Sequence, residues 1–360
     1  MMKAAVLKRF GSPLEIEHIE DPVLGTGEVI VDIVAAGVLS YANEVFSGER
    51  KYLLELPVVP GPGGIGRVSA LGPDATHLAI GDWVFCDPTV RSRDDDLAPD
   101  ITLQGWSARG PGGLKLQQHF RHGSFAQRMR VPTENAKPIG SIDADDAAQW
   151  CALGSLLVPY GGFLAANLQA GETVLISGAT GRFGSAAVAV ALAMGAGAVV
   201  TPGRNETMLA ELRRRFGSRV HPVRLTGDEN EDTERMKRAS PARIDCVLDI
   251  MPPSVATSVV RSAMMTVRPY GRVVLMGGVG MLGGAGLDLP YPWIMRNCIT
   301  IHGVWMCPPS ATTKLVGLIR AGLLDLGQYE ATCFDLDHVN DAVAHAAANS
   351  APFKLTVIRP

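Results

Sequence analysis

The sequence predicts an α/β protein in which a doubly wound parallel sheet is joined to a β-rich region. From about residue 145 onward, helical patterns alternate with strand patterns along the chain. The strands of this part are dense in Val, Ile and Leu and lack polar alternation, which is typical of a parallel sheet covered on both faces. The earlier residues form short apolar runs separated by Gly, Pro and Asp. Because successive strand–helix–strand units build a doubly wound sheet, we expect that architecture for the second part.

Four apolar or alternating runs predict strands in the first part: "KAAVLKRFG" (3–11), "EVIVDIVAAGV" (28–38), "GIGRVSALG" (64–72) and "GDWVFCD" (81–87). The stretch 88–124 that follows is polar and rich in Gly and Pro, and it predicts a long excursion or lobe. Loops of that length inside compact domains are often functional. A mobile, solvated insert is the alternative.

In the second part, helices and strands are expected to alternate along the chain. The predicted helices are 145–167, 182–195, 205–217, 253–267, 311–326 and 337–349, and the predicted strands are 173–178, 198–203, 244–251, 271–278, 298–306 and 353–360. Asp145 or Asp146 is a start signal for the first helix. Asn205 is an expected N-cap and Gly217 an expected stop for the third.

Length and composition restrict the class of protein. The chain has 360 residues, enough for two domains, and 47% of them are hydrophobic, so it can bury large cores. A net charge of −3 without a long basic run disfavours nucleic-acid binding, which depends on neutralising phosphates. The N-terminus lacks the apolar core of a signal peptide. No apolar segment reaches a membrane-spanning length, so no membrane partner is expected.

The six cysteines are scattered, and no two have the short spacing of a metal or redox motif. They do not resemble a disulfide framework, so a reducing cytoplasm is the expected location. We expect each to be a buried thiol used as a small apolar residue. Their positions are Cys86, Cys151, Cys246, Cys298, Cys307 and Cys333.

A glycine-rich turn, "GATGRFG", lies between the strand 173–178 and the helix that follows it. Gly178, Gly181 and Gly184 are spaced three residues apart. A helix N-terminus exposes unpaired N–H groups, and a diphosphate binds there when the backbone comes close enough, which glycines permit. The turn therefore predicts a dinucleotide site. The alternative is that the glycines serve only close packing of helix against strand.

The end of the second strand indicates which dinucleotide is bound. NAD-binding proteins usually carry an acid there for the ribose hydroxyls. This chain has Arg204, whose guanidinium would attract a 2′-phosphate, so NADP(H) is the expected cofactor. The alternative is that Arg204 is a solvated residue and Glu206 holds the ribose. The expected cofactor-binding residues are Gly178, Thr180, Gly181, Arg182, Phe183, Gly184, Arg204, Asn205 and Gly277.

With these motifs the whole chain resembles the medium-chain dehydrogenase/reductase family. The resemblance includes the opening "MKAAVLKRFGSPLEIEHIEDP", "GPGGIGRVSALG", the glycine turn, "GRVVLMGG" and "GLIRAGLLDL". It implies a GroES-like catalytic domain at 1–145 and 307–360, with the insert at about 88–124. It also implies a Rossmann NADP-binding domain at 146–306. The turn is closer to the zinc-free quinone reductase branch than to zinc alcohol dehydrogenases.

Departures from the family pattern fall on its zinc ligands. Zinc-dependent members carry Cys-His or Cys-Arg after the "AAGV" strand, where this chain has Leu39 and Ser40. They carry Gly-His-Glu where this chain reads Gly61-Pro62-Gly63, and their third ligand falls at Gly154 or Ser155. The stretch 88–124 has none of the four cysteines of a structural zinc lobe. Because a catalytic zinc needs about three protein ligands, we expect a metal-free enzyme.

Without zinc, a hydrogen-bond donor must polarise the substrate carbonyl. Tyr41 takes the place of the proton-relaying Ser or Thr of zinc-dependent relatives, and a phenol can donate both a hydrogen bond and a proton. Glu44 lies further along the same segment and is a candidate relay to solvent. The alternatives are a pocket-wall role for Tyr41 and a solvated helix position for Glu44. Trp106, Trp293 and Trp305 either line the cleft or pack in cores, and His119 and His122 are expected on the surface.

The expected activity is NADPH-dependent reduction of a carbonyl compound, at either the C=O bond of an aldehyde or ketone or the C=C bond of an enone or quinone. A dinucleotide-binding protein with a structural or regulatory role is the alternative. The run "NCITIHGVWM" is expected to form the edge strand of the sheet near 298–306. A bare apolar edge invites pairing with a second copy, so we expect a homodimer.

Overall fold

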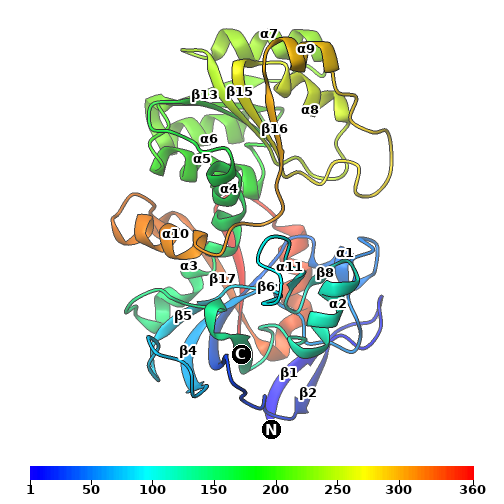
Figure 1. Ribbon diagram of the computed structural model, residues 1–360, viewed down its shortest axis with the longest axis vertical. Coiled ribbons are helices and arrows are strands. Elements are labelled where there is room, and N and C mark those ends of the chain that lie inside the picture. The colour runs from blue at the N-terminus through cyan, green and yellow to red at the C-terminus, as the bar shows by residue number, and fades with distance from the viewer. The chain divides into compact units, whose positions relative to one another are not determined.

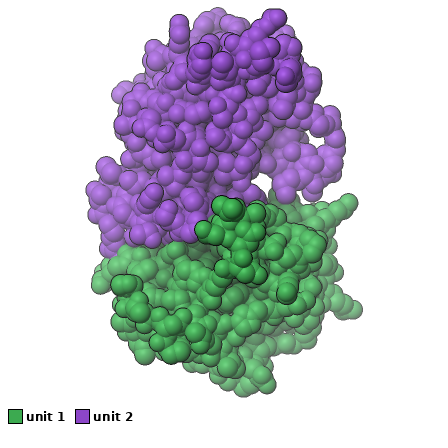
Figure 2. Space-filling view, viewed as in Figure 1, with its two compact units in different colours: residues 1–154, 326–350, 354–360 green, residues 155–325, 351–353 purple.

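The computed structural model describes residues 1–360, which group into two compact units. Unit 1 comprises 1–154, 326–350 and 354–360, and unit 2 comprises 155–325 and 351–353 (Figure 2). The second unit thus begins at Ser155 and holds the residues up to Asp325. The boundaries expected for the functional domains, at 145/146 and 306/307, stay a prediction.

Unit 1 is built on a mostly antiparallel sheet that is completed by two strands from the C-terminal part of the chain, which pair with each other in parallel. The sheet order is β10 (Ala136–Pro138), β5 (Trp83–Cys86), β4 (Gly64–Leu71), β3 (Glu28–Val38), β18 (Lys354–Arg359) and β17 (Glu330–Asp335), and β9 (Arg128–Pro132) also pairs with β3. A separate ribbon joins β1 (Met2–Val6) to β2 (Glu15–Ile19). The four strands predicted in the first part are confirmed, whereas β2 and β17 were not predicted. Both alternate charged or polar residues with few apolar ones.

The helices of unit 1 are short. They are α1 (Ala42–Phe46), α2 (Gly110–His119), α3 (Ala147–Trp150) and α11 (Val339–Ala348). The prediction of one continuous helix over 145–167 is wrong. The chain forms a 3-10 turn at Ala144–Asp146, then α3, and after a break at 151–152 it forms α4 (Leu153–Ala165).

The stretch 88–124 is an ordered lobe. It folds into a three-stranded sheet of β6 (Thr89–Arg91), β7 (Ile101–Leu103) and β8 (Ser107–Arg109), followed by α2. Trp106 is 1% exposed within it, with Val90 and Ile101 also buried. The reading of a mobile, solvated insert is therefore wrong, because a few apolar side chains among many polar ones suffice for a small core.

Unit 2 is a six-stranded parallel sheet in the order β13 (Val220–Arg224), β12 (Ala198–Gly203), β11 (Thr173–Ser177), β14 (Ile244–Asp249), β15 (Val267–Leu275) and β16 (Thr300–Gly303). The order reverses direction at β11, which is the mark of a doubly wound sheet. Its helices are α4, α5 (Arg182–Ala193), α6 (Glu206–Phe216), α7 (Glu229–Ala239), α8 (Thr257–Met264), α9 (Tyr291–Arg296) and α10 (Ala311–Arg320) (Figure 1). The predicted α/β fold class is confirmed.

Three elements of unit 2 were missed by the sequence pattern: β13, α7 and the short helix α9. Strand β13 contains a proline and two basic residues, which suit its place at the edge of the sheet. Helix α7 reads "ENEDTERMKRA" and has almost no apolar periodicity. The helix α6 is as predicted, with Asn205 as its N-cap and Gly217 as its C-cap. The last strand, predicted for 298–306, covers only Thr300–Gly303.

The cores of both units are apolar, and no helix of the chain combines the length and apolar character that crossing a bilayer requires. Leu175, Val200, Val247 and Val273 centre the core on one face of the parallel sheet. Four of the six cysteines are buried, but Cys298 and Cys333 are exposed. The expectation that all six are buried thiols is therefore wrong for these two, which lie in segments near the unit surface.

Candidate functional site

The glycine turn has the geometry that its sequence predicts. Strand β11 ends at Ser177, Gly178 has φ +95°, and Gly181 is the N-cap of α5. A Cβ on Gly184 would lie 1.9 Å from the carbonyl oxygen of Gly178, so a side chain there would collide with the backbone. A Cβ on Gly181 would meet only that same oxygen, at 3.4 Å. Close packing therefore explains why residue 184 is a glycine. At residue 181 there is room for a methyl group, so close packing does not explain the glycine there.

Three buried polar atoms at the carboxyl ends of adjacent strands have no hydrogen-bond partner. They are the hydroxyl oxygens of Ser177 on β11 and Thr201 on β12, and Oδ1 of Asp249 on β14. Ser177 and Asp249 are register partners in the parallel ladder. Buried polar groups are rarely left unsatisfied, because each one costs free energy. Ser177 and Asp249 point to the same face of the sheet, whereas Thr201 points to the other face, because its neighbour Val200 is the register partner of Leu175. The pair Ser177 and Asp249 therefore fits a polar ligand at this edge.

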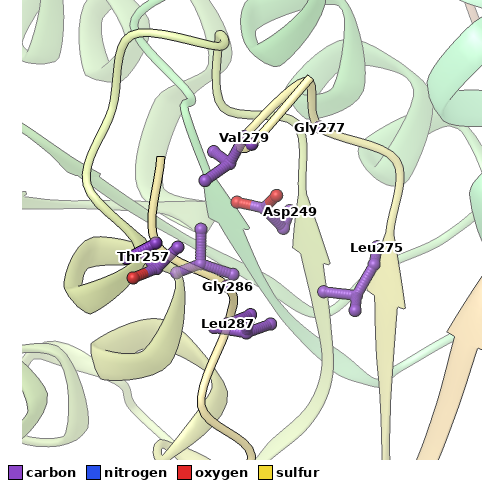
Figure 3. A pocket seen from close by; sticks show the side chains of 10 residues that line it. Asp249, Thr257, Leu275, Gly277, Val279, Gly286 and Leu287 are labelled. Carbon is purple, nitrogen blue, oxygen red and sulfur yellow. The ribbon is translucent and has the colours of Figure 1, made fainter. Parts of the chain in front are cut away.

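Asp249 borders a cavity of about 160 Å³ (Figure 3). The cavity is otherwise lined by small or apolar residues and one hydroxyl: Thr257, Val260, Leu275, Gly277, Val279, Gly280, Ala285, Gly286 and Leu287. Burial raises the pKa of Asp249 to about 6, while the Ser177 hydroxyl and the Met251 amide act in the opposite direction. No other titratable residue lines the cavity.

Asp249→Asn is expected to raise the melting temperature of the cofactor-free protein above about pH 6. The folded-state pKa of about 6 lies above the ordinary 3.8, so the folded protein holds this proton more tightly than the unfolded chain. Stability is then lost as the pH rises from about 4 to 6, by about 3 kcal/mol in all. Thermal unfolding of both proteins from about pH 4 to 8 measures the difference. A wild-type protein at least as stable as the variant at the upper end of that range contradicts this account.

The end of β12 carries the residues expected at the adenosine ribose. Arg204 is exposed, and Asn205 accepts a hydrogen bond from the Met208 amide (3.0 Å) as the cap of α6. Glu206 forms an ion pair with Arg224 (2.5 Å), a residue that the sequence did not suggest. Arg224 is the register partner of Gly203 on the neighbouring strand β13. Arg204 and Arg224 both lie at this edge of the sheet. The alternative, in which Glu206 holds the ribose, needs Glu206 to be a free acid, whereas Glu206 is paired with Arg224.

The remaining expected cofactor residues lie around the same edge of unit 2. A Cβ on Gly203 would lie 2.6 Å from Cγ2 of Thr180, so the glycine turn packs against the end of β12. Gly277 follows β15, and a Cβ there would lie 2.4 Å from Oδ2 of Asp249. Arg182 and Phe183 are the first residues of α5, and the Arg182 Nε donates to the Ser155 hydroxyl (3.0 Å). The fold thus gathers the residues that the sequence assigned to the cofactor.

Tyr41 and Glu44 are brought together in unit 1 by a residue that the sequence analysis missed. The Arg50 guanidinium lies over the Tyr41 ring, 4.1 Å from its centroid, and its Nε donates to Oε2 of Glu44 (2.9 Å). Trp106 of the lobe meets the Tyr41 ring edge-on at 5.8 Å between centroids. No local pattern links Glu44 to Arg50, which lies beyond the end of α1. The arrangement fixes the plane of the phenol between a cation and an indole.

The residues at the zinc-ligand positions do not fit a metal. Leu39 has no donor atom, and Gly61 and Gly63 have no side chain and adopt positive φ angles. Residues 1–360 contain no group of three or more His, Cys, Asp or Glu arranged to hold a metal ion.

The two histidines expected on the surface and the remaining tryptophans, Trp293 and Trp305, lie outside the candidate sites. The Nε2 of His119 contacts Oε1 of the buried Glu28 (2.5 Å), and Nδ1 of His122 accepts from the Val59 amide (3.1 Å). Trp293 packs against the core of unit 2, and Trp305 is 43% exposed. Neither the histidines nor these tryptophans join the candidate sites described above.

Two family models match the chain in succession. The alcohol dehydrogenase GroES-like domain matches residues 25–141, and the zinc-binding dehydrogenase model matches residues 183–321. An alcohol dehydrogenase of Geobacillus stearothermophilus is 26% identical over 77% of this chain and 77% of its own length. An acryloyl-coenzyme A reductase of Metallosphaera sedula is 28% identical over 84% of each chain.

The solved structures agree in fold. A thermostable alcohol dehydrogenase from Pyrobaculum aerophilum superposes with a TM-score of 0.76 at 21% identity, over 100% of this chain and 99% of the other. At that identity the likeness concerns the fold. The two family models and the relatives point to an oxidoreductase of the alcohol dehydrogenase type, and this structure agrees with them in fold.

Proposed function

The chain belongs to the medium-chain dehydrogenase/reductase family of oxidoreductases, and we propose that it is an NADPH-dependent, zinc-independent member that transfers a hydride between the nicotinamide and a carbonyl compound. The observation that carries the proposal is the glycine turn, where Gly181 leaves the helix N-terminus open to a close-lying ligand. The buried Asp249 carboxylate, with Ser177 as its register partner on the neighbouring strand, supports a polar ligand at the same edge.

In this proposal the first turn of α5 and Gly178–Gly184 hold the diphosphate, and Arg204 and Asn205 lie at the adenosine ribose. When bound, NADPH supplies the hydride. The exposed Arg204 after β12 favours a 2′-phosphate, because guanidinium groups bind phosphate through charge-assisted hydrogen bonds. The ion pair of Glu206 with Arg224 argues against Glu206 as the acceptor of a ribose hydroxyl.

Arg204→Ala is expected to weaken NADPH binding by roughly tenfold or more and to change NADH binding little, since only NADPH carries the 2′-phosphate. Fluorescence titration of both nucleotides measures the two dissociation constants. Arg243→Ala removes an exposed arginine elsewhere in unit 2 and serves as the charge control. An equal loss for NADPH and NADH in the Arg204 variant would remove the 2′-phosphate contact from the proposal.

The zinc-independence of the proposed reaction rests on the side chains present. Leu39, Ser40 and the 61–63 segment "GPG" provide no ligand set at the positions where zinc-dependent relatives have one. We therefore propose that protein groups polarise the carbonyl, with Tyr41 as the proton donor and Glu44 as its relay to solvent. The contacts of Arg50 with both residues support this pairing. Elemental analysis of the purified protein should find no stoichiometric zinc.

The substrate class stays at a carbonyl compound reduced at C=O or C=C. The names of the relatives, an alcohol dehydrogenase and an acryloyl-coenzyme A reductase, include both kinds of bond. A panel of aldehydes, ketones, enones and quinones, followed by the loss of NADPH absorbance, distinguishes them. Tight NADPH binding without turnover of any member would favour the second candidate, a non-catalytic NADPH-binding protein. We propose a cytoplasmic location from the scattered cysteines and expect no nucleic-acid or membrane partner.

We also propose a homodimer formed through β16, the edge strand near 298–306. Strand β16 ends the order of the parallel sheet, so its outer edge is not paired within the chain. Exposed large apolar side chains concentrate around it in the sequence: Met281, Leu282, Leu289, Tyr291, Met295 and Trp305. Such a concentration is typical of a protein interface.

Sedimentation equilibrium is expected to give twice the chain mass of 38.2 kDa. Trp305→Glu places a charge beside the strand on a side chain that is 43% exposed, and it should shift the protein toward monomer. Leu97→Glu, at a side chain that is 97% exposed in the lobe, is the matched control and should remain dimeric. A wild-type monomer would contradict the proposed assembly.

A further inference from the structure

The strand order of unit 2 arranges four candidate ligand positions in a row along one edge of the sheet. Strands β12, β11, β14 and β15 are consecutive neighbours. Their carboxyl ends carry Arg204, the glycine turn, Asp249 and Gly277 respectively. Neighbouring strands lie about 4.8 Å apart, so the row has a defined direction from Arg204 toward Gly277.

A nicotinamide dinucleotide has its groups in a fixed order as well. The diphosphate joins the adenosine ribose, which bears the 2′-phosphate in NADPH, to the second ribose, which bears the nicotinamide. With the 2′-phosphate at Arg204 and the diphosphate at the glycine turn, the second ribose falls on the other side of the turn. The residue at that position is Asp249, at the end of β14.

The side chain of Asp249 has the chemistry that a ribose needs. It is 3% exposed, and its Oδ1 lacks a hydrogen-bond partner. The Ser177 hydroxyl, on the register partner of Asp249, lies close enough to this carboxylate to act on its pKa. A carboxylate accepts hydrogen bonds and a hydroxyl both donates and accepts, so together they match the two hydroxyl groups of a ribose.

The cavity beside Asp249 gives such a group room. Its volume of about 160 Å³ is far more than the roughly 10–15 Å³ that a single water requires. In Figure 3 the Asp249 carboxylate lies among the cavity side chains, with Val279 and Gly277 above it, Thr257 to its lower left and Leu287 below it. The other lining side chains are apolar except for Thr257, so Asp249 is the charged anchor of the cavity.

We propose that Asp249, with the Ser177 hydroxyl beside it, binds the hydroxyl groups of the nicotinamide ribose and so fixes the reactive half of the dinucleotide. This inference rests on the proposed function, since it assumes that the glycine turn holds the diphosphate. It assigns a ligand to a buried carboxylate that otherwise only costs stability. Gly277 completes the subsite, because any side chain there would collide with Oδ2 of Asp249 and with the backbone of Met251.

The test compares two ligands that differ by the nicotinamide mononucleotide half, which includes the second ribose. NADPH contains it, and adenosine 2′,5′-bisphosphate does not. Asp249→Asn is expected to weaken NADPH binding about tenfold or more, because a charge-assisted hydrogen bond is lost, and to leave adenosine 2′,5′-bisphosphate binding unchanged. Ser177→Ala should act in the same direction and more weakly. Isothermal titration calorimetry gives all dissociation constants, and circular dichroism confirms the fold of each variant.

Asp288→Asn is the matched control, since it removes one carboxylate from a side chain of unit 2 that is 84% exposed. Unchanged NADPH affinity in a folded Asp249→Asn protein would overturn the inference, and so would an equal loss for both ligands. Failure of the wild-type protein to bind either ligand would instead overturn the proposed function, and this inference with it. The two kinds of failure are therefore distinguishable.

Discussion

Gly181→Ala is expected to weaken NADPH binding by about tenfold to a hundredfold while costing the protein at most about 1 kcal/mol of stability. The added methyl group meets no protein atom closer than the Gly178 oxygen at 3.4 Å. It would, however, stand on the surface where the diphosphate must approach the backbone amides of α5. Fluorescence titration with NADPH and thermal unfolding measure the two effects separately.

Gly184→Ala is the matched variant, and its main expected effect is a loss of stability. Its Cβ would lie 1.9 Å from the Gly178 oxygen and 2.7 Å from Cα of Ala179, so the turn itself must move at a cost of about 3 kcal/mol. Gly317→Ala, in α10 with no atom within 4 Å, controls for the substitution itself. If Gly181→Ala binds NADPH as tightly as the wild type, the glycines serve only packing, and the dinucleotide site is wrong.

Tyr41→Phe is expected to lower kcat by about a hundredfold or more with little change in the dissociation constant of NADPH. The variant keeps the ring that contacts Arg50 and Trp106 and removes only the phenol oxygen. A group that donates a proton in the transition state should affect kcat, whereas a residue of the pocket wall should not. Steady-state kinetics with the best substrate of the carbonyl panel measures it.

Tyr270→Phe removes a phenol from an exposed position, 74% accessible, and should leave kcat unchanged. Glu44→Gln separates the relay from the donor. It should lower the rate less than Tyr41→Phe does, because water can carry the proton in its place. Full turnover in a folded Tyr41→Phe protein would assign the phenol to the pocket wall.

The order of elements could be predicted wherever the pattern was local. The strands at 28–38 and 198–203 were bounded correctly by their apolar runs, and Asn205 and Gly217 marked both ends of α6. Prediction failed where the local signal was weak. Helix α7 has almost no apolar stripe, and the lobe at 88–124 builds its core on a few side chains such as Trp106.

The residues of the candidate site likewise divide into those that local sequence indicated and those that it did not. The glycine turn could be found from the sequence, because a strand, a tight turn and a helix N-terminus are made by neighbouring residues. Arg224, Arg50 and Asp249 gave no comparable signal. The partners of these residues are Glu206, Tyr41 and Ser177, and only folding brings them close.

The sequence by itself thus determined the kind of fold, the glycine turn at which we propose that a diphosphate binds, and the absence of zinc-ligand side chains at the family's positions. Only the tertiary structure decided that Arg224 engages Glu206, that Arg50 joins Tyr41 to Glu44, and that the buried carboxylate at the end of β14 borders a cavity. The reason is physical. Backbone turns and caps depend on the conformation of a few consecutive residues, whereas these contacts depend on which strands pair and how the chain closes between them.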